Sequence, residues 1–167
     1  MSPLLKTLIL AAALVLAACD QPESKAPPPA IADIPDSAVD PLSHMAALET
    51  DGHKGQIHFA DGSDPLWFGS IANMMVYMRL PETATRPMTA YASTADAHGN
   101  SAEPWQWVNV QDAWFVLLPP DENNPLSLAT WTAYPDEQSA KTVLQNIAKS
   151  RLYRFADIGD EDLLDCH

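Results

Sequence analysis

Residues 56–80 read QIHFADGSDPLWFGSIANMMVYMRL, and this stretch decides the fold class of the chain. Residues 56–60 alternate between polar and apolar side chains, a pattern typical of a half-buried strand. The dipeptide Asp61-Gly62 then favours a turn, and residues 65–68 predict a hairpin partner for that strand. The first part of the stretch therefore indicates two short strands next to each other in the sequence.

The second part of the stretch has helical periodicity. Pro81 closes a predicted helix over residues 69–79, in which the apolar side chains recur at helical spacing: Ile71, Met74, Met75 and Met78. This spacing favours a core face over a methionine-rich metal site, because the same positions form one stripe of a helix. Residues 88–93 predict the next strand, so the first half has the order strand, strand, helix, strand.

The second half repeats that order without any repeat at the level of residues. Strands are predicted near residues 113–118, 129–134 and 152–155, with an additional strand over 105–110 at the join. A helix opens at Pro135-Asp136-Glu137 and carries one apolar stripe: Ala140, Val143, Leu144 and Ile147. The sequence thus predicts an α+β fold, with two ββαβ-type units forming one compact domain over residues 41–156 and helices packed on mostly antiparallel sheet.

The N-terminus has the pattern of a secretory segment. Residues 1–18 contain Lys6, an apolar run and small residues ahead of Cys19, which predicts a signal peptide followed by a lipidated cysteine. An uncleaved transmembrane helix is the alternative, but the apolar run is short for a span of about 20 residues. Acyl chains on Cys19 would anchor the protein to the membrane.

Two segments flank the predicted domain. Residues 19–40 are rich in proline and alanine, which predicts a semi-stiff tether. Asp20 directly after the lipidated cysteine favours the periplasmic side of the inner membrane. Residues 157–167 form an acidic tail, for which we expect a frayed end. Cys166 and the terminal His167 could alternatively bind a soft or borderline metal.

The formal charge of −13 limits the partners of this chain. It excludes nucleic-acid binding and suits either a cationic ligand, a basic partner protein or simple solubility near a membrane. If Cys19 is acylated, Cys166 is the remaining thiol, so no intramolecular disulfide is expected.

No catalytic motif is present, and the chain is predicted not to be an enzyme. Soft ligands gather near the start of the domain, in His44 and Met45, followed by His53 and His58. A thioether suits Cu(I), and imidazole suits either oxidation state of copper. Neighbouring side chains of a strand point to opposite faces, so His44 and Met45 can share an ion only if their segment is irregular. A surface histidine followed by a buried methionine is the structural alternative.

At these residues the chain resembles the NosL family, the accessory lipoproteins of nitrous oxide reductase. The family has a Cys-Gly-Met or His-Met element, here His44-Met45, followed by a Lys-Gly-Gln-Ile strand, here residues 54–57. Trp67-Phe68 followed by a helix and Arg79-Leu80-Pro81-Glu82 also resemble the family. The resemblance implies a paired ββαβ fold like that of organomercurial lyase, without its activity.

The resemblance also implies the function. NosL proteins are periplasmic copper chaperones that hand Cu(I) to the maturation machinery of nitrous oxide reductase, which includes an ABC-type membrane complex. His44 and Met45 map onto the family's metal element, and His98 or Met88 could complete the site. Two thioethers usual in the family are missing, since residues 91–96 and 126–129 contain no methionine. A scaffold that docks on the maturation complex without metal is therefore the alternative function.

Overall fold

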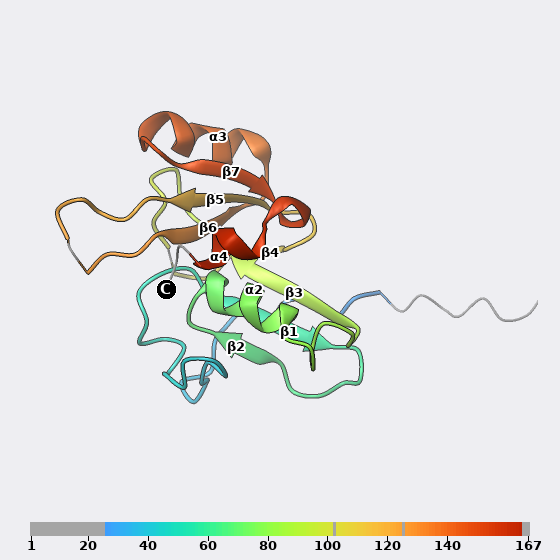
Figure 1. The fold of residues 1–167 in the computed structure, drawn as a ribbon. Helices are drawn as coiled ribbons and strands as arrows, with labels where there is room; N and C mark the ends of the chain where they lie inside the picture. Colours follow the sequence, from blue (N-terminus) through green and yellow to red (C-terminus); the bar gives the residue numbers. More distant parts are fainter. Residues whose placement is uncertain (1–25, 102, 125, 165–167) are drawn as a thin grey trace, which may run out of the picture.

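The computed structural model describes residues 26–101, 103–124 and 126–164. The predicted signal peptide, Cys19 and the Cys166-His167 pair lie outside the described residues. Figure 1 shows two sheets, the first with helix α2 in the lower half of the view and the second with helix α3 in the upper half. Within the described part of the chain, no helix has the length and apolar character needed to cross a membrane.

The first sheet has four strands in the order β2-β1-β3-β4, all antiparallel to their neighbours. Its elements are β1 (Gly55–Phe59), β2 (Leu66–Phe68), α2 (Ile71–Arg79), β3 (Met88–Ser93) and β4 (Trp107–Asn109). Ser70 caps α2, because its side chain accepts a hydrogen bond from the Asn73 N–H. The predicted hairpin and helix are confirmed, with bounds shifted by one or two residues.

The second sheet has three strands in the order β6-β5-β7, again antiparallel. Its elements are β5 (Trp114–Leu118), β6 (Thr130–Tyr134), α3 (Glu137–Asn146) and β7 (Arg151–Arg154). In the first unit β1 lies between β2 and β3, and α2 connects β2 to β3. In the second unit β5 lies between β6 and β7, and α3 connects β6 to β7. The α+β fold with two ββαβ units is therefore confirmed, and β4 is the additional strand at the join.

One hydrophobic core joins the two units. Helix α2 contacts β1 and β2 of the first sheet and β6 of the second. Its buried Met74 and Met75 pack with Phe115 and Trp131 of the second unit, which confirms that these methionines are core residues. Helix α3 covers the other face of the second sheet with Ala140 and Val143. The positions of both helices follow from the apolar stripes in the sequence.

The outer face of the first sheet is covered by the N-terminal segment instead of a helix. The Gln56 side chain is fully buried, accepts a hydrogen bond from the Ile31 N–H and donates one to the Ile31 carbonyl. Tyr91 donates to the Pro28 carbonyl, and Trp107 donates to the Ala32 carbonyl. The predicted tether is therefore wrong for residues 28–34, because these hydrogen bonds hold them on the sheet.

The expectation of a frayed C-terminal end is also wrong for part of the acidic tail. Residues Phe155–Asp157 form a 3-10 helix, η1, and Asp160–Leu164 form helix α4. Leu163 is buried in the main core. Asp162 accepts hydrogen bonds from the Tyr153 hydroxyl at 2.7 Å and from the Gly159 N–H at 2.9 Å. The buried side chains of Ile158 and Leu163 and the hydrogen bonds to Asp162 thus fix a segment whose composition indicated solvent exposure.

Candidate functional site

His44 and Met45 lie at the turn of a narrow two-stranded ribbon formed by residues 38–47. The Asp40 N–H donates to the Met45 carbonyl at 2.9 Å, and the Ala47 N–H donates to the Ala38 carbonyl at 2.9 Å. His44 has a φ of 59°, in the left-handed region, where histidine is more frequent than most other residues. Side chains of neighbouring residues point to opposite faces in a regular strand, so His44 and Met45 can share an ion only where the backbone departs from that conformation. The left-handed conformation of His44 is such a departure. We call residues 38–48 the metal loop.

Both side chains of the pair are exposed to solvent. Met45 has 52% of its surface accessible, although methionine is usually a core residue. His44 is exposed as well, and its backbone N–H donates to the Asp40 carbonyl at 2.9 Å. The structural alternative of a buried Met45 is therefore wrong, and a thioether and an imidazole are both free to meet an ion from solution.

The buried side chain of Asp40 fixes the shape of the metal loop. Its Oδ1 accepts hydrogen bonds from the Leu42 N–H at 2.8 Å and the Ser43 N–H at 3.2 Å. Its Oδ2 accepts from the Gly69 N–H at 2.9 Å and from the Asn73 side-chain amide at 2.8 Å. Asp40 thus ties the loop to the N-terminal end of α2, where the partial positive charge of a helix favours a carboxylate.

Gly69 and Lys54 both form hydrogen bonds with Thr50, which follows the metal loop by two residues. The Thr50 hydroxyl donates to the Gly69 carbonyl at 2.9 Å, and the Lys54 ammonium donates to the Thr50 hydroxyl at 3.0 Å and to the Thr50 carbonyl. A Cβ added at Gly69 would clash with Thr50, so this close approach requires glycine. Burial lowers the pKa of Lys54, and the nearby charges of Asp51 and Glu103 act in the opposite direction.

His98 lies at the same end of the first sheet as the metal loop. It sits on the β3–β4 connection, and its N–H donates to Asp96 Oδ1 at 2.7 Å. Gly55, at the start of β1, pairs with Phe68 at the end of β2 and with Ala92 near the end of β3. Helix α2 begins three residues after Phe68, so its first turn lies near the same end of the sheet. His98 follows β3 by a few residues and is exposed. The structure leaves His98 exposed on this loop, whose Gly99 approaches Leu118 and Ile147 of the second unit.

Met88 lies at the opposite end of β3 from the metal loop. It pairs with Phe59 at the end of β1. The five residue steps from Met88 to Ser93 correspond to about 16 Å of strand. The structure therefore does not bring Met88 to His44 and Met45, although the sequence analysis considered it as a ligand.

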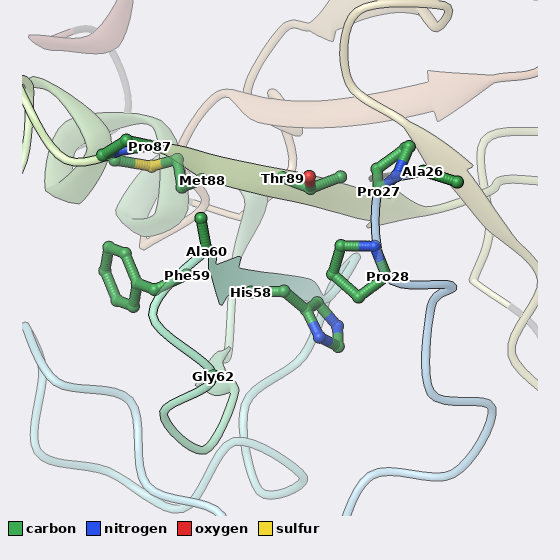
Figure 2. Close-up of a pocket in the computed structure, with 10 residues that line it drawn as sticks. All are labelled: Ala26, Pro27, Pro28, His58, Phe59, Ala60, Gly62, Pro87, Met88 and Thr89. Carbon is green, nitrogen blue, oxygen red and sulfur yellow. The ribbon is translucent and has the colours of Figure 1, made fainter. Parts of the chain in front are cut away.

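Met88 lines a pocket of about 390 Å³ together with His58 and the first described residues of the chain. Figure 2 shows Met88 beside Pro87 at one end of this pocket and the His58 ring beside Pro28 at the other. Gln56 Oε1 accepts a hydrogen bond from the Ile31 N–H, and His58 Nε2 lies 2.7 Å from the same oxygen. Because an amide oxygen can only accept, His58 Nε2 is the donor in this second hydrogen bond. Burial lowers the pKa of His58, which keeps the ring neutral. His58 is thus a hydrogen-bonded sheet residue and not part of the metal loop.

His53 is a buried histidine at the junction between the two units. Its Nε2 lies 3.0 Å from the Gly99 carbonyl, which can only accept, so Nε2 carries the proton. Burial lowers the pKa of His53 more strongly than the Gly99 hydrogen bond and the Asp96 charge raise it. Nδ1 of His53 is buried without a hydrogen-bond partner. Ligand chemistry placed His53 among the soft ligands, whereas in the structure its ring is buried and binds the Gly99 carbonyl, next to His98 in the sequence.

Asp40 supports the candidate site, although ligand chemistry alone gave no reason to select it. The signal available was the Asp40-Pro41 dipeptide, since an aspartate before proline favours the start of a turn. Nothing in the sequence indicated its contacts with Gly69 and Asn73, which are distant along the chain. Among the described residues, no three His, Cys, Asp or Glu side chains form a group that could hold a metal ion.

Comparison with known proteins identifies the family. The NosL family model matches residues 31–163. Among curated proteins, none matches the chain significantly. The crystal structure of the copper chaperone NosL from Shewanella denitrificans matches with a TM-score of 0.66 and 18% sequence identity, and the match covers 81% of this chain and 99% of that one.

The solution structure of the apo-NosL protein from Achromobacter cycloclastes is a weaker match, with a TM-score of 0.47 and 18% identity over 65% of this chain and 87% of that one. The match to the Shewanella protein shows that the two chains share a fold. The family match extends from the N-terminal segment on the first sheet to Leu163 of α4, so it includes the metal loop and both ββαβ units. The chain therefore belongs to the NosL family.

Proposed function

We propose that this chain is a copper chaperone that carries Cu(I) as cargo on His44 and Met45. The observation that carries the proposal is the exposed Met45 beside a left-handed His44, on a loop fixed by the buried Asp40. Thioether and imidazole ligands match the preference of Cu(I) and do not match hard cations such as Mg²⁺. Copper chaperone NosL from Shewanella denitrificans shares the fold.

An exposed site with two ligands suits transfer better than storage. A recipient protein can approach the ion directly and replace its ligands one at a time. His98, or a side chain of the recipient, could supply a third ligand. In this function the chain changes neither the oxidation state nor the bonding of a substrate molecule, so it is not an enzyme.

The proposed setting is the periplasmic face of the inner membrane. A lipidated Cys19 would anchor the chain, and the recipients would be nitrous oxide reductase and its ABC-type maturation complex. The hydrogen bonds of Pro28 and Ile31 to the first sheet would make the proposed tether shorter than residues 19–40. The formal charge of −13 argues against nucleic acid as a partner.

A metal-free scaffold that docks on the maturation complex is the second candidate function. The absence of methionine from residues 91–96 and 126–129 favours it, since the family usually has thioethers at those places.

An anaerobic Cu(I) competition titration with a chromophoric chelator tests the proposal. The chain from residue 19 onward would carry Cys19→Ser to prevent acylation. The His44→Ala/Met45→Ala variant is expected to bind Cu(I) at least about 30-fold more weakly, a loss of about 2 kcal/mol. Met88→Leu is the matched control, because it removes a thioether at the far end of β3 and should leave the affinity unchanged.

The outcome separates the two functions. Equal affinity of the double variant and the parent protein would overturn the copper site at His44 and Met45. Binding that is lost in Cys166→Ser/His167→Ala and kept in the double variant would move the site to the C-terminus. If no form binds copper but the ABC-type complex still co-purifies with the chain and with the double variant, the scaffold function is supported.

A further inference from the structure

The metal loop carries an unusual concentration of exposed apolar side chains. Among the described residues, seven large apolar side chains are exposed, and four of them come from residues 31–48: Ile31, Val39, Met45 and Leu48. Val39 is 54% exposed, slightly more than Met45. Large apolar groups gathered on one part of a surface indicate an interaction site more often than chance exposure.

Three of these exposed side chains come from the metal loop itself: Val39, Met45 and Leu48. Val39 lies directly opposite Ala46 in the ribbon. The Asp40 N–H donates to the Met45 carbonyl, so Met45 lies opposite Asp40, one position along the ribbon from the pair of Val39 and Ala46. Leu48 follows Ala46 by two residues. We call Val39, Met45 and Leu48 the loop patch.

The buried side of the ribbon explains why the loop patch faces outward. Ala38 and Ala47 are buried against Trp67 and form a small apolar cluster on the outer face of the first sheet. Asp40 is fully buried beneath the turn. The inward positions are therefore filled by small side chains and by Asp40, while the large apolar side chains remain in contact with water.

The surroundings of the loop patch are acidic. The chain has no Lys or Arg between Lys25 and Lys54, and Lys54 is buried. Four exposed acidic residues lie in this stretch: Asp33, Asp36, Glu49 and Asp51. Within the described part of the chain, none of these four forms an ion pair. Among the Asp, Glu, Lys and Arg residues of this segment, those that are exposed are therefore all acidic.

We propose that the loop patch is the docking surface for a partner protein with an apolar centre and a rim of Lys and Arg side chains. The proposal rests on the copper-chaperone function, because it makes this partner the protein that exchanges Cu(I) with His44 and Met45. An apolar centre with a charged rim is the usual anatomy of a protein interface. Opposite charges at the rim guide the encounter and accelerate association.

The same charges disfavour other occupants of the surface. A second copy of this chain would bring two sets of exposed carboxylates together, and like charges across an interface cost several kcal/mol. Anionic lipid headgroups would be repelled for the same reason. A basic partner protein is the occupant that both the apolar side chains and the charges fit.

Copper transfer to metal-free nitrous oxide reductase, with and without its ABC-type complex, tests the docking surface. Three double variants would be compared with the parent protein in stopped-flow transfer at low and high salt. Asp33→Lys/Glu49→Lys reverses charges beside the loop patch, and Val39→Ser/Leu48→Ser removes apolar contacts. Asp64→Lys/Glu82→Lys is the matched control, because it makes the same change in net charge at exposed positions outside the segment around the metal loop.

The first two variants are expected to slow the second-order transfer step about tenfold. The effect of the charge reversal should shrink at high salt, whereas that of the apolar variant should persist. The control should match the parent protein. Equal transfer rates for all four proteins would overturn the docking surface.

The Cu(I) affinity of each protein is measured separately, so failure of the chaperone function is distinguishable from failure of the docking surface. If the parent protein binds Cu(I) and transfers it equally well without the loop patch, only the docking proposal fails. If no protein binds Cu(I), equilibrium binding of the metal-free chains to the same two partners replaces the transfer assay. Weaker binding of both loop-patch variants would then support the surface, and equal or undetectable binding would overturn it.

Discussion

Asp40 Oδ2 accepts a hydrogen bond from the Gly69 backbone N–H at 2.9 Å, across 29 positions of the sequence. This contact joins the metal loop to the residue that precedes the N-cap of α2. Because Oδ1 of the same carboxylate accepts from Leu42 and Ser43, one side chain fixes both the turn and its place on the domain. The orientation of His44 and Met45 therefore depends on Asp40.

Replacement of Asp40 by alanine is expected to destabilise the fold by about 3 kcal/mol, because it leaves the buried Gly69 N–H and three part-buried N–H donors without their acceptor. Cu(I) affinity should fall as well, since the loop loses its fixed shape. Urea unfolding and chelator competition measure the two effects. Asp36→Ala is the matched control: this aspartate is exposed, and its replacement should change stability by less than about 0.5 kcal/mol. An Asp40→Ala variant as stable as the control would contradict the role given to Asp40.

His44→Gly should separate stability from copper binding. Glycine adopts a φ of 59° without strain, so the variant should be as stable as the parent protein or more stable by up to about 1 kcal/mol. The same change removes the imidazole and should weaken Cu(I) binding. His44→Val should destabilise, because a β-branched residue disfavours this backbone conformation. Thermal unfolding of both variants checks the prediction, which fails if His44→Gly is the less stable of the two.

Leu163 and Leu164 offer a matched pair for the contribution of α4. Leu163 is 3% exposed and belongs to the main core, whereas Leu164 is 70% exposed. Leu163→Ala should cost about 2–4 kcal/mol in the free energy of unfolding. Leu164→Ala should cost less than about 0.5 kcal/mol. Equal effects in urea unfolding would show that α4 does not pack on the core in solution.

Acidification should destabilise the fold through His53. Burial lowers the pKa of this histidine below its ordinary value of 6.5, so the unfolded chain binds its proton more readily than the folded protein does. The stabilising effect of the neutral ring is complete above pH 6.5 and decreases as the pH falls toward the lowered pKa of the folded state. His58 acts in the same direction.

His53→Gln should therefore lose less stability than the parent protein between pH 7.5 and pH 5, as measured by urea unfolding at a series of pH values. His98→Gln is the control for the removal of one exposed imidazole. Parallel curves for His53→Gln and the parent protein would contradict the assignment of a buried neutral ring to His53.

Local patterns in the sequence predicted the elements well. The strand at residues 88–93 and the helix ending at Arg79 have the predicted bounds, because alternation and helical periodicity are read within a few residues. The duplicated ββαβ order followed from the same patterns. His44 and Met45 were found by ligand chemistry alone, which requires no knowledge of their surroundings.

Contacts between distant residues could not be predicted in this way. Composition indicated a free tether over the proline-rich segment, yet Gln56 binds Ile31 through two hydrogen bonds. Composition also indicated a frayed acidic end, yet Leu163 is a core residue. In both places a few specific contacts outweigh the average character of the segment.

The elements, the α+β class and the soft-ligand pair of His44 and Met45 could be predicted from the chain alone, because they depend on short-range periodicity and side-chain chemistry. Only the tertiary structure decided which other residues accompany that pair. It places Met88 at the far end of β3 and sets Asp40 beneath the loop. The physical reason is that strand pairing and burial act between residues far apart in the chain, and no local pattern records which of them meet.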